Sequence, residues 1–230
     1  GYAITGHEGS STGTIVTAYS GGDLSKLNED NHQVTASSKR RQFKENYDYF
    51  INKIYSMGTS PQSDYTQAQR DDLQKPSQSP INTGRQAYYA NGNATIQSAW
   101  SVAGDESIVV FVNGSLTIKN TVTVAPGGFV AFIVSGDITI DPSVGTADYA
   151  STTPQVEGLY IADGIFTVDS LAVGTTKTHD KKFVGAGTFV GWNGVSLERD
   201  YQDTASPDLG IKNNTVPSEV FVARPDLLLA

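Results

Sequence analysis

Short apolar segments separated by glycine turns recur through the middle of the chain. In each copy an apolar strand ends at a small polar residue and a glycine, and a short strand of mostly apolar, threonine, apolar pattern follows. The copies cover residues 88–96, 110–118, 132–140 and 160–168, with a weaker fifth at 190–197. Their glycines are spaced by 22, 22, 28 and 30 residues: Gly92, Gly114, Gly136, Gly164 and Gly194. This period of short strands and glycine turns predicts a β-solenoid.

If the copies stack about 4.8 Å apart, equivalent residues form rows along the molecule. Strand alternation predicts two inward apolar rows, an outward threonine row and a corner row of small polar residues. The inward rows are Ala94, Leu116, Ile138, Phe166 and Ile96, Ile118, Ile140, Val168; the threonines are Thr95, Thr117, Thr139, Thr167; the corner row is Asn91, Asn113, Ser135, Asp163, Asn193. Asn side chains can hydrogen-bond along such a row. We interpret the corner row as structural, with ligand binding as the alternative.

The two longer spacings place insertions between copies. One insertion follows Asp141 and contains Tyr149, and the other spans about 169–182 and contains Lys177 and His179. Insertions in repeat proteins emerge as loops and often carry binding. Tyr149, Lys177 and His179 are therefore candidate contact residues.

A single segment, residues 38–57, has the apolar period of a helix. Its apolar side chains form one stripe: Phe43, Tyr47, Phe50, Ile51, Ile54 and Tyr55. Serine precedes the segment and Gly58 follows it, as caps do. We expect this helix to cover an exposed end of the β region; a partner-binding or membrane-surface helix is the alternative. The proline-containing residues 59–86 read as an extended connector.

The last 30 residues read as a tail that can protect the far end of the solenoid. Val220 and Val222 alternate as in a strand, and the chain ends near the apolar run Leu227, Leu228 and Leu229. An open sheet edge pairs with other chains unless it is covered. We expect the tail to fold back as a side strand or cap, and docking on a neighbouring subunit is the alternative.

Composition narrows the classes of function. The chain has 16 Lys and Arg against 24 Asp and Glu, a net charge of −8, which disfavours a general nucleic-acid binder. The absence of cysteine excludes disulfides, thiolate metal sites and cysteine nucleophiles. No apolar run is long enough to span a membrane. Richness in Gly, Ser, Thr and Asn is typical of extracellular bacterial proteins.

Several segments resemble a group of uncharacterised extracellular β-helix surface proteins of uncultured small-genome bacteria. The resemblance rests on residues 46–50, 156–164, 189–200 and 217–227, together with the Gly-x-x-Thr-Ile repeats. It implies a β-helix at the cell surface and offers no catalytic residues. The architecture is also similar to the polymer-forming bactofilins. The helix and the insertions depart from the bare bactofilin solenoid, which puts end-to-end polymerisation in doubt.

Candidate chemistry is sparse. Asp137 and Asp163 fall at one corner of adjacent copies, where a carboxylate pair could act as acid and base or bind Ca²⁺; capping of the corner is the favoured interpretation. Nearby Asp141 and Asp169 are weaker candidates. Glu198, Arg199 and Asp200 read as a surface or inter-segment ion pair. No P-loop, nucleophile elbow or zinc-ligand spacing occurs, so we expect no cofactor, no metal site and no enzyme activity.

The sequence therefore predicts an all-β fold: a parallel, right-handed β-helix of about five coils capped by an amphipathic helix. Residues 1–86 form an irregular segment with the helix at 38–57, residues 87–200 the solenoid, and residues 201–230 the tail. We expect a self-associating structural protein of the cell exterior. A glycan-binding adhesin and a polysaccharide lyase or hydrolase are alternatives. Candidate ligand or subunit contacts are Tyr149, Lys177, His179, Trp192, Val220, Val222, Leu227, Leu228 and Leu229.

Overall fold

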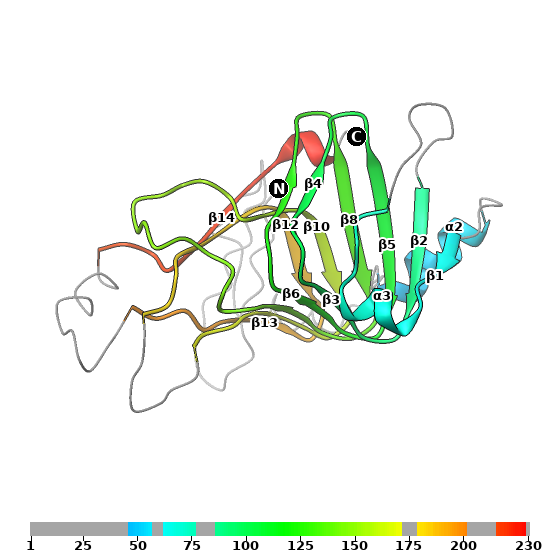
Figure 1. The fold of residues 1–230 in the computed structure, drawn as a ribbon, viewed down its shortest axis with the longest axis horizontal. Helices are drawn as coiled ribbons and strands as arrows, with labels where there is room; N and C mark the ends of the chain where they lie inside the picture. The colour runs from blue at the N-terminus through cyan, green and yellow to red at the C-terminus, as the bar shows by residue number, and fades with distance from the viewer. Residues whose placement is uncertain (1–45, 57–61, 77–85, 172–178, 202–214, 229–230) are drawn as a thin grey trace, which may run out of the picture. The chain divides into compact units, whose positions relative to one another are not determined.

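The computed structural model describes residues 46–56, 62–76, 86–171, 179–201 and 215–228, all within one compact unit, Lys44–Ala230. Strands account for 44% of the described residues, and their ladders are parallel (Figure 1). The elements are α2 (Tyr47–Ser56), β1 (Gln62–Asp64), α3 (Gln67–Asp71), β2 (Gln86–Asn91), β3 (Ala94–Ile96), β4 (Trp100–Val102), β5 (Ser107–Asn113), β6 (Leu116–Ile118), β7 (Val122–Val124), β8 (Phe129–Val134), β9 (Ile138–Ile140), β10 (Val156–Ala162), β11 (Ile165–Val168), β12 (Phe183–Gly191), β13 (Gly194–Leu197), β14 (Glu219–Val222) and the 3-10 helix η3 (Pro225–Leu228).

The strands form two parallel sheets in which a strand pairs with its counterpart in the next copy. One sheet has the order β1-β2-β5-β8-β10-β12-β14, with β4 and β7 beside this path, and the other has the order β13-β11-β9-β6-β3. The second half of β10 pairs with β8, whereas its first residue, Val156, pairs with Val122 of β7. Strand β10 therefore joins two series of strands into one nine-stranded sheet.

The pairing register follows the sequence repeat. Leu116 lies between Ala94 and Ile138, and Thr117 lies between Thr95 and Thr139. Every residue of the two inward rows is buried as far as Phe166 and Val168. The predicted inward and threonine rows are thus confirmed. Beside them a column of aromatic rings runs through the core, with successive centroids 5.2, 5.4 and 5.2 Å apart: Trp100, Phe132, Tyr160 and Phe189.

Side chains of the corner row, and those just after its glycines, hold this register. In the predicted row, Asn113 Nδ2 donates to Asn91 Oδ1 (3.1 Å) and Ser135 Oγ donates to Asn113 Oδ1 (3.3 Å). One position after the first three corner glycines, a side chain accepts a backbone N–H from the next copy; Asp137 Oδ1, for example, accepts from Ile165 N at 2.8 Å. A Cβ on Gly164 would lie 2.0 Å from that Oδ1, so glycine is needed for the contact.

The fifth copy is shifted by one residue from its predicted alignment. Gly194 pairs with Ile165, and Asn193 N donates to the carbonyl of Gly164. The turn between β12 and β13 holds two residues, like the turn before β11, so the strand ends set the register and the glycines do not. Trp192 therefore occupies the place in the corner row that was predicted for Asn193.

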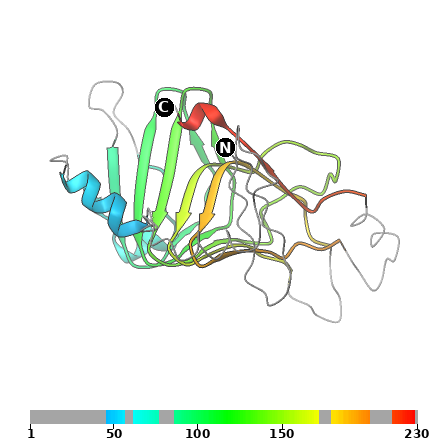
Figure 2. The ribbon, with the colours of Figure 1, turned by 180° about the vertical axis from the view of Figure 1, so that it is seen from behind.

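Helix α2 lies on the outer face of a sheet. Tyr47, Phe50, Ile51 and Ile54 pack with outward side chains of β2, β5 and β8, and the Tyr47 ring meets Phe111 edge-on at 5.9 Å. Figure 2 shows the helix as a blue ribbon beside the strands. The expected position at the end of the β region was wrong, because an apolar stripe does not specify the surface that buries it. Tyr55 is exposed, and Phe43 lies outside the described residues.

The first edge of both sheets is covered by residues 62–76. Strand β1 pairs with β2, and Leu73 N donates to the carbonyl of Thr95 in β3 (2.7 Å). Asp72 Oδ1 accepts the N–H groups of the two residues after β3, each at 3.2 Å. Lys75 Nζ lies 2.5 and 2.6 Å from the carboxylate oxygens of Glu106. This segment, interpreted from sequence as a connector, thus closes the first edge.

The described part of the tail, residues 215–228, pairs with β12 and then packs against the main core. Strand β14 pairs with β12, placing Val220 beside Val184. Arg224 Nη1 then donates to Glu157 Oε1 (2.8 Å) and to the carbonyl of Val124 (3.0 Å). Leu227, in η3, is buried in the main core. This arrangement secures the tail where β7 and β10 diverge.

Replacing a buried residue of the inward rows should cost much more stability than replacing its outward neighbour. Ile118 is fully buried, so Ile118→Ala should lower the free energy of unfolding by about 2–5 kcal/mol. The control, Thr117→Ala on the same strand, should change it by about 0.5 kcal/mol. Urea unfolding measures both values, and equal losses would contradict the inward and outward assignment.

The contact between Lys75 and Glu106 should make the first edge acid-sensitive. Burial opposes ionisation of Glu106, but hydrogen bonds from Lys75 and the Ala103 N–H outweigh it and lower the pKa of the carboxyl. A lowered folded-state pKa stabilises the fold above the unfolded-state pKa, and this contribution is lost as the pH falls through the folded value. Glu106→Gln should therefore be less stable than wild type at neutral pH, with a gap that narrows below about pH 4.

Urea unfolding across this pH range measures the gap. Asp105→Asn, which neutralises the exposed neighbouring carboxyl, is the control and should not reproduce the pH-dependent gap. A gap between wild type and Glu106→Gln that stayed constant from neutral to acid pH would argue against a stabilising contact.

Candidate functional site

Three long connections leave the strands and return to them: residues 141–155 between β9 and β10, 169–182 between β11 and β12, and 198–218 between β13 and β14. The first two are the predicted insertions, and the third was counted as part of the tail. Their described ends meet around one buried side chain, Arg199. We use the name loop cluster for the residues that link these connections: Tyr149, Asp180, Lys182, Arg199 and Tyr201.

Arg199 holds the bases of these connections together. Its guanidinium donates three hydrogen bonds to backbone carbonyls, those of Asp141 (2.9 Å), Asp169 (2.6 Å) and Lys181 (2.9 Å). The Arg199 main chain reaches the tail, because its N–H donates to Glu219 Oε1 (2.6 Å) and its carbonyl accepts from Ser218 Oγ (2.8 Å). A planar, rigid fork of donors suits such a multiple contact better than the single ammonium of lysine.

Asp180 is the second buried charge of the cluster. Its carboxylate accepts hydrogen bonds from Ser170 Oγ (2.7 Å), Leu171 N (2.8 Å) and Asp200 N (2.8 Å). These donors lie on two different connections, so Asp180 ties the second connection to the third. A buried charge is tolerated when it is hydrogen-bonded in this way.

The electrostatics of the cluster centre on a permanent cation. Burial lowers the pKa of the Arg199 guanidinium, and nearby carboxylates, led by Asp180 and then Glu219, act against this shift. An arginine nevertheless stays protonated in proteins. Burial also raises the pKa of Tyr201 to about 12, with Tyr149 contributing. The tyrosine hydroxyl is therefore neutral beside the cluster at physiological pH.

The first connection is also attached to the second. Thr146 and Lys182 form an antiparallel bridge with two backbone hydrogen bonds of 2.9 Å. Lys182 is buried, and its Nζ donates to the carbonyl of Tyr149 (2.9 Å). The Tyr149 ring in turn packs edge-on against Tyr201, with centroids 4.6 Å apart.

The predicted contact residues that the structure describes lie in several places and form no single cluster. Tyr149 packs within the loop cluster and half-buried His179 precedes Asp180, whereas Trp192 lies at the far corner between β12 and β13. Val220 and Val222 are on β14, Leu227 is buried in the core, and Leu228 ends η3. Lys177 and Leu229 lie outside the described residues.

The candidate carboxylate pair is engaged with the backbone. Asp137 accepts from Ile165 N, and Asp163 Oδ1 accepts from Tyr47 N (3.0 Å), where it caps helix α2. These contacts fit the corner-capping interpretation. Within the part of the chain that the structure describes, no group of three or more metal-ligating side chains occurs.

Sequence reasoning missed the roles of Arg199 and Asp180. The triplet Glu198, Arg199 and Asp200 was interpreted as a surface or inter-segment ion pair. The structure does link segments there, but Arg199 is buried and donates to carbonyls. The available signal was an arginine two residues after the end of a short strand, at the start of a long connection.

The chain matches no family model, no curated protein and no solved structure. No helix among the described residues is long and apolar enough to cross a membrane.

Loss of the buried arginine should loosen all three connections. Arg199→Met should lower the free energy of unfolding by about 3–5 kcal/mol, because it leaves the buried Asp180 carboxylate without its nearby cation and three backbone carbonyls without their donor. Arg199→Lys should recover only part of this loss, since an ammonium cannot reproduce the fork of donors. Urea unfolding measures the loss, and hydrogen exchange should localise it to residues 141–155 and 179–182.

Lys119→Met is the matched control for this experiment. Lys119 is exposed and lies 4.0 Å from the Asp141 carboxylate, so its removal should cost about 0.5 kcal/mol or less. An Arg199→Met loss as small as that of the control would contradict the bracing role.

Proposed function

We propose that the chain is a β-helix and that it serves as a structural protein of the cell exterior. The parallel pairing of each strand with the strand one copy later supports the β-helix, as do the continuous inward rows. About five coils follow from the five copies, and right-handedness follows from the usual chirality of parallel crossovers.

The bracing by Arg199 is the observation that carries the structural role. Three of its five N–H donors go to the backbone of the connections. The Asp180 carboxylate and the Lys182 ammonium likewise bond to neighbouring segments. These charged groups hold the connections in place, and a rigid arrangement of this kind favours a structural role over a catalytic one.

The two alternative functions receive less support. A glycan-binding face would need exposed aromatic rings side by side. Tyr160, however, is fully buried in the core, and the Tyr149 ring packs edge-on against Tyr201. A polysaccharide lyase or hydrolase would need two available carboxylates, and those of Asp137 and Asp163 bind backbone N–H groups.

Location outside the cell is part of the proposal. It is supported by the composition, rich in Gly, Ser, Thr and Asn, and by the resemblance to surface β-helix proteins. The role would be that of a subunit in a surface layer, appendage or filament, with other copies of the chain as its partners.

Light scattering and negative-stain electron microscopy at several protein concentrations test this role. A structural subunit should form defined assemblies whose fraction rises with concentration. A monomer at every concentration would overturn the proposal. A glycan array distinguishes the adhesin: binding that Trp192→Ala abolishes and Tyr55→Ala, at an exposed tyrosine in the last turn of α2, preserves would replace the structural role by glycan recognition.

A further inference from the structure

Exposed apolar side chains gather at the last strands of the two sheets. Six of the eight large exposed apolar side chains of the described residues belong to the segments from β11 to β14: Ile165, Trp192, Val195, Leu197, Phe221 and Val222. Concentrations of this kind usually mark a contact surface, because scattered single residues are the ordinary pattern.

Two of these residues occupy inward positions. Val195 pairs with Phe166 and Leu197 pairs with Val168, whose side chains are fully buried. Val195 is nevertheless 55% exposed and Leu197 51% exposed, since no described strand lies beyond β13. We name the surface made by Val195, Leu197, Phe221 and the outer edge of β13 the open end.

The aromatic column also reaches the open end. Phe221 packs on Phe189 at 5.2 Å and on Phe183 at 5.7 Å between ring centroids, yet it remains 40% exposed. The core is therefore continuous with this surface, and covering it would extend an existing stack of rings.

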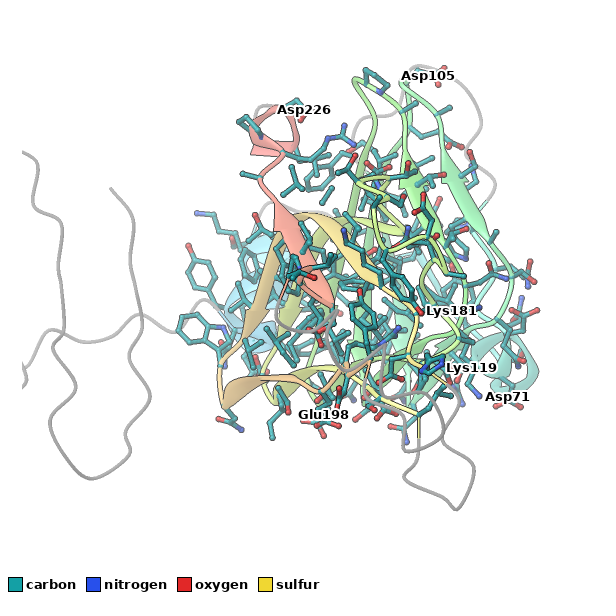
Figure 3. All side chains as sticks on the ribbon, turned by 90° about the vertical axis from the view of Figure 1, so that its left-hand side faces the viewer. Asp71, Asp105, Lys119, Lys181, Glu198 and Asp226 are labelled. Atoms are coloured by element: carbon teal, nitrogen blue, oxygen red, sulfur yellow. The ribbon has the colours of Figure 1, made fainter. Side chains whose placement is uncertain are left out.

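The open end lacks the charges that usually protect a sheet edge. From Phe183 to Leu197 the sequence contains no Asp, Glu, Lys or Arg. Glu219, on the neighbouring strand, directs its carboxylate to Arg199 N and Ser218 Oγ. Figure 3 looks onto this side and shows Glu198 and Asp226 near its lower and upper margins. Isolated edge strands normally carry Lys, Pro or inward charges that prevent pairing.

A second copy fits the open end as its occupant, because this surface brings no charge into the contact. Two chains of net charge −8 repel each other, and contact between like charges is unfavourable. An uncharged face lets two copies meet without burying like charges. The opposite edge is already covered by residues 62–76, so a head-to-tail chain of copies would lack its second surface.

We propose that the open end is the contact between two copies of this chain, related by a two-fold axis. The β13 strands then lie side by side and antiparallel, and the exposed inward side chains of each copy are buried against those of the other. This inference rests on the proposed structural role and identifies its partner surface.

Light scattering of the full 230-residue chain, with size-exclusion chromatography, tests the contact. Wild type should show twice the 24.5 kDa monomer mass. The double variant Val195→Lys, Leu197→Lys should be monomeric at the same concentration, with a dissociation constant raised by about a hundredfold or more. The control is Ser101→Lys, at an exposed position of β4, a strand that pairs with β7; it adds a lysine outside the open end and should keep the dimer.

The absence of cysteine allows a second measurement that needs no charge in the contact. The double variant Val195→Cys, Leu197→Cys should form a disulfide-linked dimer under mild oxidation much faster than Ser101→Cys, which lies on an exposed position of β4. Antiparallel pairing about a two-fold axis at residue 195, 196 or 197 places cysteine opposite cysteine, within the distance that a disulfide needs. Equal rates would overturn the proposed contact.

The remaining outcomes separate this inference from the proposed function. Assemblies that persist in the Lys double variant would overturn the open end as the contact and leave the structural role intact. A monomeric wild type at every concentration would overturn both. A monomeric wild type whose melting temperature drops in the double variant, but not in Ser101→Lys, would show that another segment of the same chain covers this end.

Discussion

The register between successive copies is the constraint on which the rest of the structure depends. Strand pairing alone permits slippage, and a slip of one residue would turn every inward side chain outward. The corner side chains oppose this, because Asn93, Ser115 and Asp137 each accept a backbone N–H from the next copy. Close passage of these groups leaves no room for a Cβ on the neighbouring glycine, as at Gly164. The polar contacts therefore require the glycines, as the turns do.

The parts of the fold that sequence could predict are those governed by local repetition. The strands and the inward and threonine rows follow from alternation and a constant period, both visible in one chain. Asn193 was misplaced because the period was counted between glycines, whereas pairing is counted from the strand end at Gly191. Helix α2 was placed at the wrong surface for a similar reason: its apolar stripe indicates burial, and the outward Phe111 and Ile133 that bury it lie far along the chain.

The loop cluster could not be predicted, because it depends on contacts between residues far apart in sequence. Arg199 reaches carbonyls 58, 30 and 18 residues away. Every residue has a backbone carbonyl, so the sequence does not indicate which carbonyls accept these hydrogen bonds. A buried charge such as Arg199 needs hydrogen bonds in place of the water that burial removes, and here backbone carbonyls supply the acceptors. The gain here is positional, since one cation sets the bases of three connections whose lengths differ. Such an arrangement allows the connections to vary while the rows beneath them stay unchanged.

The two ends of the stacked strands are treated differently, and this difference bears on how the protein works. At the first edge, Asp72, Leu73 and Lys75 satisfy backbone groups and a carboxylate, so the rows end within the chain. At the last edge the inward rows end at Val195 and Leu197, and no described strand covers these two side chains. Burial of apolar surface is worth about 25 cal/mol per Å². Val195 and Leu197 gain only part of this free energy in a single chain, and polar residues at these positions would avoid the exposed apolar surface. A surface of this kind is best explained by a contact that completes it.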